Sequence, residues 1–393
     1  MDLCCDYNPI TTAGNEPLLE TSNPASISQV LGGVGHNIAT ALHYAGARVR
    51  LCAPVGDDLA GRAATIDLKS RGLDIAGLRI VHGSRTTPQY VAINDKRKNL
   101  FVAMADMRLL EGSIDMVDDL WPTEIVKSKP KWLVVDANWS KELMKKWTQA
   151  GRAVGSKIAL EPVSVEKSSR LFYKTWKDHM QDHLEPRKDI QEYLADLVSP
   201  NRAELKAMAR HIRPENAWSI LLTSLAIPMV DSLQPNLANF KDVASDAVKL
   251  LSEFRCIVTK LGSEGVLLTE LLLDVDARLE DPNQDPYIVL RRAGSSSRNK
   301  STILLPSVDP ESSISSIAGV YIRHYPPAQK VPEQDIVNVN GVGDTFLGVL
   351  IAALLKEKTS KPISELINIA QQAAVLTLQD SAAVSLKIKD LLI

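Results

Sequence analysis

Short apolar strands alternate with helical segments along most of this chain, and this alternation limits the possible folds more than any other feature of the sequence. Strands are predicted at Trp132–Asp136, Lys157–Glu161, Leu197–Ser199 and Cys256–Lys260. An apolar helix over Asp344–Lys356 follows near the end. Alternating strands and helices favour a mostly parallel sheet that helices cover on both faces. The expected fold class is therefore α/β.

The amino-terminal part follows the same alternation and begins with a glycine-rich turn. Apolar residues at helical spacing predict a helix that starts after Gly33 and ends at Gly46. A strand at Val49–Val55 and a helix at Gly61–Arg71 are expected next. These elements extend the strand and helix pattern toward the start of the chain.

Three stretches break the alternation. The first lies near 6–30 and the second near 84–104, where Thr86–Met104 is typical of two strands around a polar turn. A hairpin outside the main sheet predicts a lid that closes over a ligand. The third, near 274–327, contains the low-complexity run Gly294-Ser-Ser-Ser-Arg-Asn-Lys and is interpreted as a surface insertion.

Composition excludes several classes of protein. The 393 residues are 45% hydrophobic and 23% charged with a formal net charge of −2, which is typical of a soluble globular protein and gives no basic excess for nucleic acid. The apolar stretch Phe346–Leu355 has 10 residues, too few for a bilayer, which needs about 20. The four cysteines lack metal-site spacing, and no secretory signal is evident. A reduced, cytoplasmic protein without membrane or nucleic-acid partners is expected.

The turn Asn338-Val-Asn-Gly-Val-Gly-Asp344 leads directly into the apolar helix. Gly341 and Gly343 lack side chains, so backbone N–H groups can face a phosphate there, and the helix N-terminus adds partial positive charge. Asp344 in the first helical turn can accept a proton from an attacking hydroxyl. In the alternative interpretation, Asp344 only caps its helix and the glycines form a connecting turn. The turn alone does not decide between the two.

Further motifs resemble those of the ribokinase-like (PfkB) kinase family, in the family's order and over nearly the whole chain. They are Gly32-Gly33 with Asn37, Val55–Gly61, Pro200-Asn201-Arg-Ala-Glu204 and Thr259–Gly265. The resemblance implies a ribokinase-like three-layer α/β sandwich with a mostly parallel central sheet and a small β lid. It also implies one kinase domain over 1–393 that uses ATP and Mg²⁺. Beside these motifs, the phosphate-binding interpretation of the turn is favoured.

The resemblance also implies roles for individual residues. Asp344 is expected to be the catalytic base, with Gly341, Val342 and Gly343 forming the anion hole. Asn201 is expected near the phosphates, and Glu204 in the water network around magnesium. The residues expected to hold the nucleotide also include Thr259, Gly262, Gly265 and Asn340.

Several segments resemble pseudouridine kinases more than ribokinases or adenosine kinases: Gly32–Ala39, Ala103–Met107, Val135–Trp139 and Glu161–Val165. Expected substrate contacts are Asp2, Gly32, Gly33, Asn37, Tyr90, Asp106, Asn138 and Glu161. Directional hydrogen bonds from such groups penalise a wrong base. Two alternatives stay open: Glu161 stands at a strand end, where a carboxylate often caps a turn, and Tyr90 can simply fill the hairpin's inner face.

The sequence departs from the family pattern at several positions. The family's sugar-binding aspartate follows a first strand, but here it corresponds to Asp2, so a longer parent protein is one alternative. Asn338 stands where the family often has aspartate, which bears on binding of a monovalent cation such as K⁺. Val342 replaces the usual alanine. His36 lies beside the glycine pair, where it could touch the substrate. An exposed histidine in the first helical turn is at least as good an interpretation, so His36 is not assigned to the site.

The predicted function is ATP-dependent phosphorylation of the 5′-hydroxyl of pseudouridine. One alternative is another kinase of the family, of the ribokinase, adenosine kinase or fructokinase type. Another is a truncated, catalytically weak nucleoside-binding protein. Family members often dimerise through their lids, so a homodimer is a further expectation.

Overall fold

The computed structural model describes residues 2–8, 16–83, 86–96, 100–111, 120–172, 193–213, 219–220, 222–224, 226, 235–273, 276, 288–291, 302–304, 317–356 and 363–391. The chain divides into two compact units, each with its own sheets and helices. Unit 1 comprises Met1–Ser128 and Val331–Ile393, and unit 2 comprises Lys129–Lys330. Among the described residues, no helix combines the length and apolarity needed to cross a membrane.

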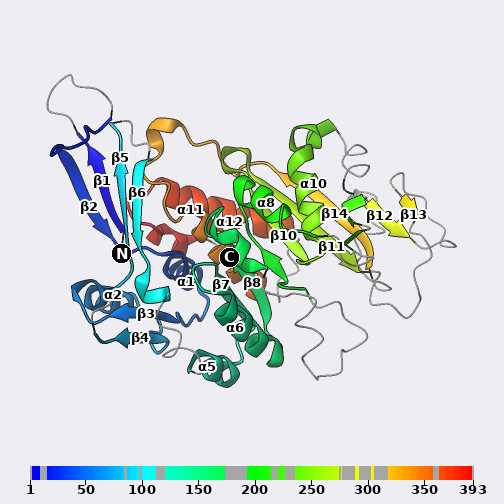
Figure 1. Cartoon of the computed structure of the whole chain (residues 1–393). Coiled ribbons are helices and arrows are strands. Elements are labelled where there is room, and N and C mark those ends of the chain that lie inside the picture. Colours follow the sequence, from blue (N-terminus) through cyan, green and yellow to red (C-terminus); the bar gives the residue numbers. More distant parts are fainter. Residues whose placement is uncertain are drawn as a thin grey trace. The chain divides into compact units, whose positions relative to one another are not determined.

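In unit 1, four strands form a sheet in the order β2-β1-β5-β6, drawn in blue and cyan in Figure 1. They are β1 (Asp2–Tyr7), β2 (Ala25–Val30), β5 (Gln89–Asn94) and β6 (Leu100–Asp106). Strand β1 pairs antiparallel with β2 and parallel with β5, and β5 pairs antiparallel with β6. The predicted hairpin outside the main sheet is therefore confirmed, while its action as a lid stays a prediction.

A smaller parallel sheet of unit 1 pairs β3 (Ala53–Gly56) with β4 (Leu78–Val81). Helix α2 (Leu59–Ser70) connects them, and the Asp58 side chain caps it by accepting a hydrogen bond from the backbone N–H of Gly61 at 2.7 Å. The predicted strand at 49–55 begins too early, because ladder pairing starts only where Ala53 lies opposite Leu78.

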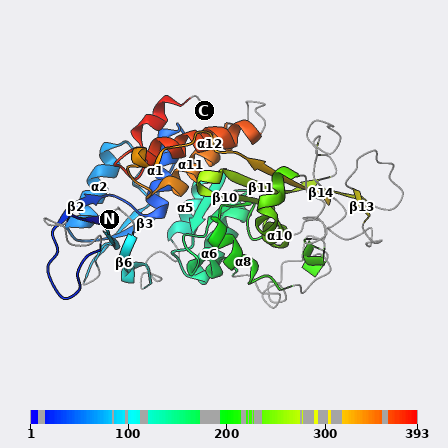
Figure 2. The ribbon, with the colours of Figure 1, turned by 90° about the horizontal axis from the view of Figure 1, so that it is seen from above.

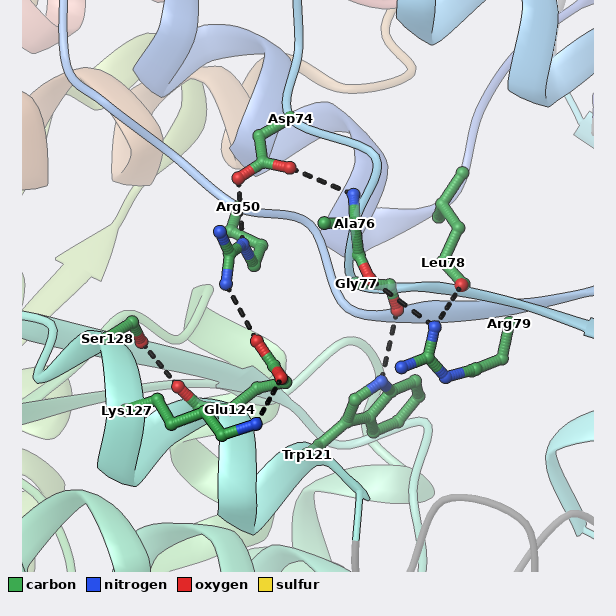
Figure 3. Close-up of polar contacts among 10 residues, drawn as sticks. All are labelled: Arg50, Asp74, Ala76, Gly77, Leu78, Arg79, Trp121, Glu124, Lys127 and Ser128. Atoms are coloured by element: carbon green, nitrogen blue, oxygen red, sulfur yellow. Dashed lines mark hydrogen bonds and ion pairs between the residues drawn. The ribbon is translucent and has the colours of Figure 1, made fainter.

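Helix α5 (Leu120–Ser128) is attached to the turn before β4 by one buried and several half-exposed contacts (Figure 3). The Arg50 guanidinium lies 2.8 Å from Asp74 and 2.9 Å from Glu124. The buried Trp121 donates its indole N–H to the backbone just before β4 at 3.1 Å. Exposed ion pairs contribute little, so burial of the indole holds this helix in place. The short helix α3 (Arg108–Glu111) follows β6.

Three helices form the core of unit 1 (Figure 2): α1 (Val34–Tyr44), α11 (Val342–Leu355) and α12 (Ile363–Leu378). Helix α11 packs against both others, and its residues 345–353 are all buried, as expected for a helix that is apolar on every side. A Cβ on Gly348 would come within 2.7 Å of Ala41 and of the Ile38 carbonyl oxygen. Glycine there lets α1 and α11 approach closely. The short 3₁₀ helices Glu333–Asp335 and Leu386–Asp390 flank this core in sequence.

Unit 2 is built on one mixed sheet of strand order β13-β12-β14-β11-β10-β9-β8-β7. Its strands are β7 (Trp132–Asp136), β8 (Lys157–Glu161), β9 (Leu197–Val198), β10 (Cys256–Lys260), β11 (Val266–Leu273), β12 (Ile288–Arg291), β13 (Thr302–Leu304) and β14 (Ile317–Tyr325). Strands β7 to β10 are parallel, and β11 and β14 continue the sheet antiparallel.

Helices α6 (Lys141–Ala153), α8 (Arg202–Ala209) and α10 (Lys241–Leu250) pack on this sheet. The 3₁₀ helices of unit 2 are Lys167–Leu171, Pro235–Phe240 and Gly262–Glu264. The interior strands β8 and β10 are almost entirely buried, which is why they appear in the sequence as continuous apolar runs.

The predicted insertion near 274–327 extends too far toward the carboxyl end. Strand β14 lies inside that range, pairs with β11, and buries Val320, Tyr321 and Ile322. It is part of the sheet, because its apolar residues cover the core beside β11. The low-complexity run at 294–300 lies outside the described residues.

Candidate active site

The turn before α11 has a backbone that only glycine adopts readily. Gly341 is the N-cap of α11 with φ of 75°, and the N–H of Thr345 donates to its carbonyl at 2.8 Å. A Cβ on Gly341 would overlap the Ala383 carbonyl oxygen. Upstream, the Asn338 side chain accepts a hydrogen bond from the N–H of Asn340 at 2.9 Å and fixes the entry to the turn. The first N–H groups of α11 therefore start from a rigid turn, and such groups form a site for an anion.

Asp344 lies in the first turn of α11, and a residue of α1 holds its carboxylate. The Asn37 side-chain NH₂ donates to Asp344 Oδ2 at 2.8 Å across 307 sequence positions. Asn37 is only 3% exposed, so its amide is fixed by the core. The structure thus brings together the glycine turn and the amino-terminal glycine motif, two of the segments singled out from the sequence.

The glycine pair before α1 sets where that helix begins. Gly33 is the N-cap of α1 with φ of 103°, and its carbonyl accepts the N–H of Asn37 at 2.9 Å. A Cβ on Gly33 would meet nothing within 4 Å, so the backbone angle explains the glycine and crowding does not. Gly32 precedes it in the loop after β2.

His36 contacts the same Asn37 side chain that binds Asp344. Its Nδ1 lies 3.1 Å from Asn37 Oδ1. The alternative of an exposed histidine is not confirmed: burial lowers the pKa of His36 below its ordinary value, and Nε2 is buried without a hydrogen-bond partner among the described residues. Sequence reasoning left His36 out, although its place beside the glycine pair was a signal.

The expected lid residues lie along one end of the four-stranded sheet. Asp2 on β1 is opposite Tyr90 on β5, and Tyr90 is opposite Ala105 on β6. Asp106 is bound to its neighbour Arg108 at 2.6 Å. The hydrogen bonds from Arg108 hold the pKa of Asp106 well below its usual range. In this structure Asp106 is therefore ionised and paired with protein, and a substrate hydroxyl would have to share or replace that partner.

In unit 2, the remaining predicted segments lie at the carboxyl ends of the parallel strands. Asp136 at the end of β7 is opposite Glu161 at the end of β8, and Asn201 after β9 bridges to Lys260 at the end of β10. Ligands of open α/β sheets bind at this edge. These motifs lie far apart in the sequence but meet at one edge of the sheet, because each follows a parallel strand.

Several of these side chains already have protein partners. Glu161 is buried, and both of its oxygens accept hydrogen bonds from Lys260 Nζ at 3.0 Å. Asn138 Oδ1 accepts one from Lys167 Nζ at 2.7 Å. The sequence did not reveal Lys260 or Lys167 as partners, because neither pairing follows from spacing along the chain.

The Pro-Asn-x-x-Glu motif folds as a capping box at the start of α8. The Asn201 side chain accepts from the N–H of Glu204 at 2.9 Å, and the Glu204 side chain accepts from the N–H of Asn201 at 2.8 Å. Asn201 is exposed, and Glu204 is 4% exposed. Each side chain satisfies a backbone group that the helix leaves unpaired. The motif therefore has a structural role here in addition to the one that the family resemblance implies.

The predicted nucleotide segment forms a tight turn between β10 and β11. Gly262 and Gly265 have φ of 62° and 93°. A Cβ on Gly262 would meet nothing within 4 Å, but one on Gly265 would overlap the Tyr325 carbonyl oxygen. Thr259 is fully buried, and its hydroxyl has no hydrogen-bond partner among the described residues. Room beside Gly262 fits the close approach of a phosphate or ribose to the backbone.

A family model describes this fold and these segments together. The model for the pfkB family of carbohydrate kinases matches residues 3–275 and 321–389, and the chain belongs to this family. The unmatched residues between these two stretches fall within the predicted insertion. The family is one of kinases that act on a hydroxyl group, so the predicted enzyme class is confirmed at the level of the family.

Sequence relatives include proteins of pseudouridine metabolism. A pseudouridine-metabolizing bifunctional protein of Schizosaccharomyces pombe is 25% identical over 98% of this chain. This chain spans only 45% of that protein's length. A pseudouridine kinase of Arabidopsis thaliana is 22% identical over 86% of this chain and 80% of its own length. One of Escherichia coli is 27% identical over 48% of this chain and 58% of its own length.

Solved structures show the same fold at low identity. Ribokinase from Giardia lamblia matches with a TM-score of 0.60 and 15% identity over 99% of this chain and 96% of its own. Ribokinase from Cryptococcus neoformans in complex with ADP matches with a TM-score of 0.59 and 15% identity over the same shares. The predicted ribokinase-like fold is confirmed.

Proposed function

We propose that this chain phosphorylates the 5′-hydroxyl of pseudouridine with ATP, giving pseudouridine 5′-phosphate and ADP. The observation that carries the proposal is the 2.8 Å hydrogen bond from Asn37 to Asp344 beside the Gly341 turn. It places a held carboxylate at the N-terminus of a buried helix. A base next to an anion site is what phosphoryl transfer to a hydroxyl requires.

In the proposed reaction, Asp344 accepts the proton of the 5′-hydroxyl as that oxygen attacks the γ-phosphate of ATP in line. The N–H groups of Gly341, Val342 and Gly343 face the charge that develops on the transferred group. Such preorganised donors act most strongly on charge that appears only in the transition state. Asn37 keeps one carboxylate oxygen engaged and so fixes the orientation of the base.

We assign the nucleotide to unit 2. The open space beside Gly262 and the buried hydroxyl of Thr259 support this assignment. Glu204 would hold magnesium through water, and the ion would neutralise phosphate charge. The carboxylate fits that role only if one oxygen keeps its bond to the Asn201 N–H while the other faces water. Binding of K⁺ near Asn338 stays a prediction.

The choice of pseudouridine rests on the relatives and on the segments that resemble pseudouridine kinases. Relatives named for pseudouridine match up to 98% of the chain. Substrate contacts from Asp2, Tyr90, Asp106, Asn138 and Glu161 are part of the proposal. Three of them already have a protein partner, since Glu161 contacts Lys260, Asp106 contacts Arg108 and Asn138 contacts Lys167. A homodimer through the lid sheet and a cytoplasmic location remain proposals of the same kind.

The test is ADP release by the purified chain with ATP, Mg²⁺ and one acceptor at a time: pseudouridine, uridine, adenosine, ribose or fructose. We expect pseudouridine to give the highest kcat/KM, with ³¹P NMR locating the new phosphate on the 5′-oxygen. A clear preference for adenosine or a free sugar would refute the substrate and keep the kinase. Binding of pseudouridine without turnover of any acceptor would favour a nucleoside-binding protein instead.

A further inference from the structure

The Asn37 amide has two polar atoms with different partners, and this fixes its orientation. Its NH₂ donates to Asp344, because a carboxylate oxygen can only accept. The amide oxygen is therefore the atom that lies 3.1 Å from His36 Nδ1. An amide turned by 180° would place its oxygen against the carboxylate, and that arrangement would be repulsive.

The orientation of Asn37 in turn fixes the proton on His36. An amide oxygen cannot donate, so Nδ1 must carry the hydrogen of this bond. Burial lowers the pKa of His36, so the ring is neutral near pH 7 and has a single N–H. The Nε2 atom is then without a proton. This nitrogen is buried, and the ring lines a cavity of about 270 Å³ together with Thr40 and Asp67.

We propose that His36 is a positioning residue, which acts through Asn37 to hold the carboxylate of Asp344 at the N-terminus of α11. Among the described residues, no hydrogen bond joins His36 to the phosphate turn or to the carboxylate itself. It donates to the Asn37 oxygen and thereby keeps the NH₂ group directed at Asp344. The inference rests on the proposed function in that it takes Asp344 as the base.

Loss of the contact between His36 and Asn37 is expected to lower kcat more than it weakens ligand binding. Without a donor at position 36, the amide loses one of the two contacts that favour its orientation, and its NH₂ group is held less firmly against Asp344. One net hydrogen bond corresponds to a change of about twofold to tenfold in an equilibrium. We therefore expect kcat to fall about fivefold in His36→Leu, with KM for ATP unchanged.

The conservative variant separates positioning from packing. In His36→Asn the side-chain NH₂ can take the place of Nδ1–H, whereas leucine fills a similar volume without any donor. We expect His36→Asn to recover at least half of the wild-type kcat. His82→Ala is the matched control, since His82 is an exposed histidine of the same unit, paired with Asp57 on the surface, and its removal should leave turnover unchanged.

A spectroscopic measurement tests the inference without any need for activity. In ¹⁵N NMR of the wild-type protein with labelled histidine, the His36 ring, assigned by its absence in His36→Asn, should show Nδ1 protonated and Nε2 unprotonated at pH 7. An Nε2-protonated ring would overturn the inference, as would equal kcat values for His36→Leu and wild type. Loss of kcat in His36→Asn as deep as in His36→Leu would also overturn it. If the wild type phosphorylates no acceptor, the proposed function fails, while the protonation of His36 still decides this inference.

Discussion

The turn before α11 in unit 1 and the sheet edge of unit 2 hold their candidate site residues in different ways. In unit 1, Asn37 contacts Asp344, and Gly341 precedes Asp344 in the same turn, so predicted site residues contact or adjoin one another. In unit 2, Glu161 pairs with Lys260 and Asn138 with Lys167, two lysines that the sequence had not assigned to the site. Asn201 and Glu204 pair with each other's backbone.

This difference separates two kinds of effect that a substitution can have. A substitution of Asp344 is expected to alter turnover more than folding, because it removes the proposed base and leaves the backbone of the turn in place. A change at the sheet edge of unit 2 removes a structural partner as well as any ligand contact. Stability and activity therefore have to be measured side by side, and the variants below are chosen to separate them.

Apart from replacement of Asp344 itself, the largest expected effect is that of Gly341→Ala. The added Cβ would overlap the Ala383 carbonyl, and the residue has φ of 75°, so the turn must move. Displacing one such backbone donor from the transition state is expected to cost about a hundredfold or more in kcat. Steady-state kinetics measures this fall in kcat. Gly155→Ala is the control, since Gly155 has φ of 80° but open space around a Cβ. It should cost only about 1 kcal/mol of stability.

A result that would contradict this expectation is easy to recognise. If Gly341→Ala and Gly155→Ala lowered the melting temperature by the same amount and had the same kcat, the Gly341 turn would be a connecting turn and not an anion site.

The second effect concerns Glu161→Gln in unit 2. Lys260 would lose its charged partner in a largely buried place, and breaking a buried pair from one side costs about 3 kcal/mol. Urea unfolding measures the loss. The double variant Glu161→Gln with Lys260→Met removes the ammonium charge as well and should recover at least half of the lost stability.

The opposite pattern would change the role of Glu161. If Glu161→Gln unfolds like the wild type while KM for pseudouridine rises about tenfold, the carboxylate is a substrate ligand and its pairing with Lys260 is incidental.

The third effect is that of Asn201→Ala, compared with Asn201→Ser. Alanine removes the N-cap of α8 and should cost about 1 kcal/mol, whereas serine keeps a capping oxygen. If Asn201 also contacts phosphate, both variants raise KM for ATP although only the alanine variant is less stable. Equal KM values in the two variants and the wild type would restrict Asn201 to its cap.

The smallest effect is at Asp58, a helix cap of unit 1. Burial raises the pKa of Asp58, but hydrogen bonds from Thr87 and from the N–H of Gly61 outweigh it, and the net pKa is below its usual value. The charge therefore stabilises the fold above the unfolded-state pKa of about 3.9, and this stabilisation is lost as pH falls through the lower folded-state pKa. Asp58→Asn should cost about 0.5 kcal/mol at pH 7, and thermal unfolding should show this difference shrinking as pH falls below about 3.9. A difference that grows toward low pH would contradict this sign.

Much of the fold was predictable because its signals are local. Strands β7, β8 and β10 have the predicted bounds, since each is a short apolar run. Strand β14 was missed, because it follows a low-complexity run and its partner β11 lies far away in the sequence.

The site was predictable as a set of segments but not as a set of contacts. The Asn-x-x-Glu spacing at position 201 is itself a capping-box signal, so that role could have been predicted. The bond between Asn37 and Asp344 could not, because it depends on how α1 packs against α11 across 307 positions. The pairing of Glu161 with Lys260 likewise depends on strand order in the sheet.

The most direct test of the central claim, that Asp344 is the base, compares kcat of Asp344→Asn with kcat of the wild type on pseudouridine and ATP. Asparagine keeps the size of the side chain but cannot accept the proton. We predict a fall in kcat of about a thousandfold, with the melting temperature and the Kd for ATP close to the wild-type values. Turnover within about threefold of the wild type, far short of the fall that loss of a general base causes, would contradict the assignment of Asp344.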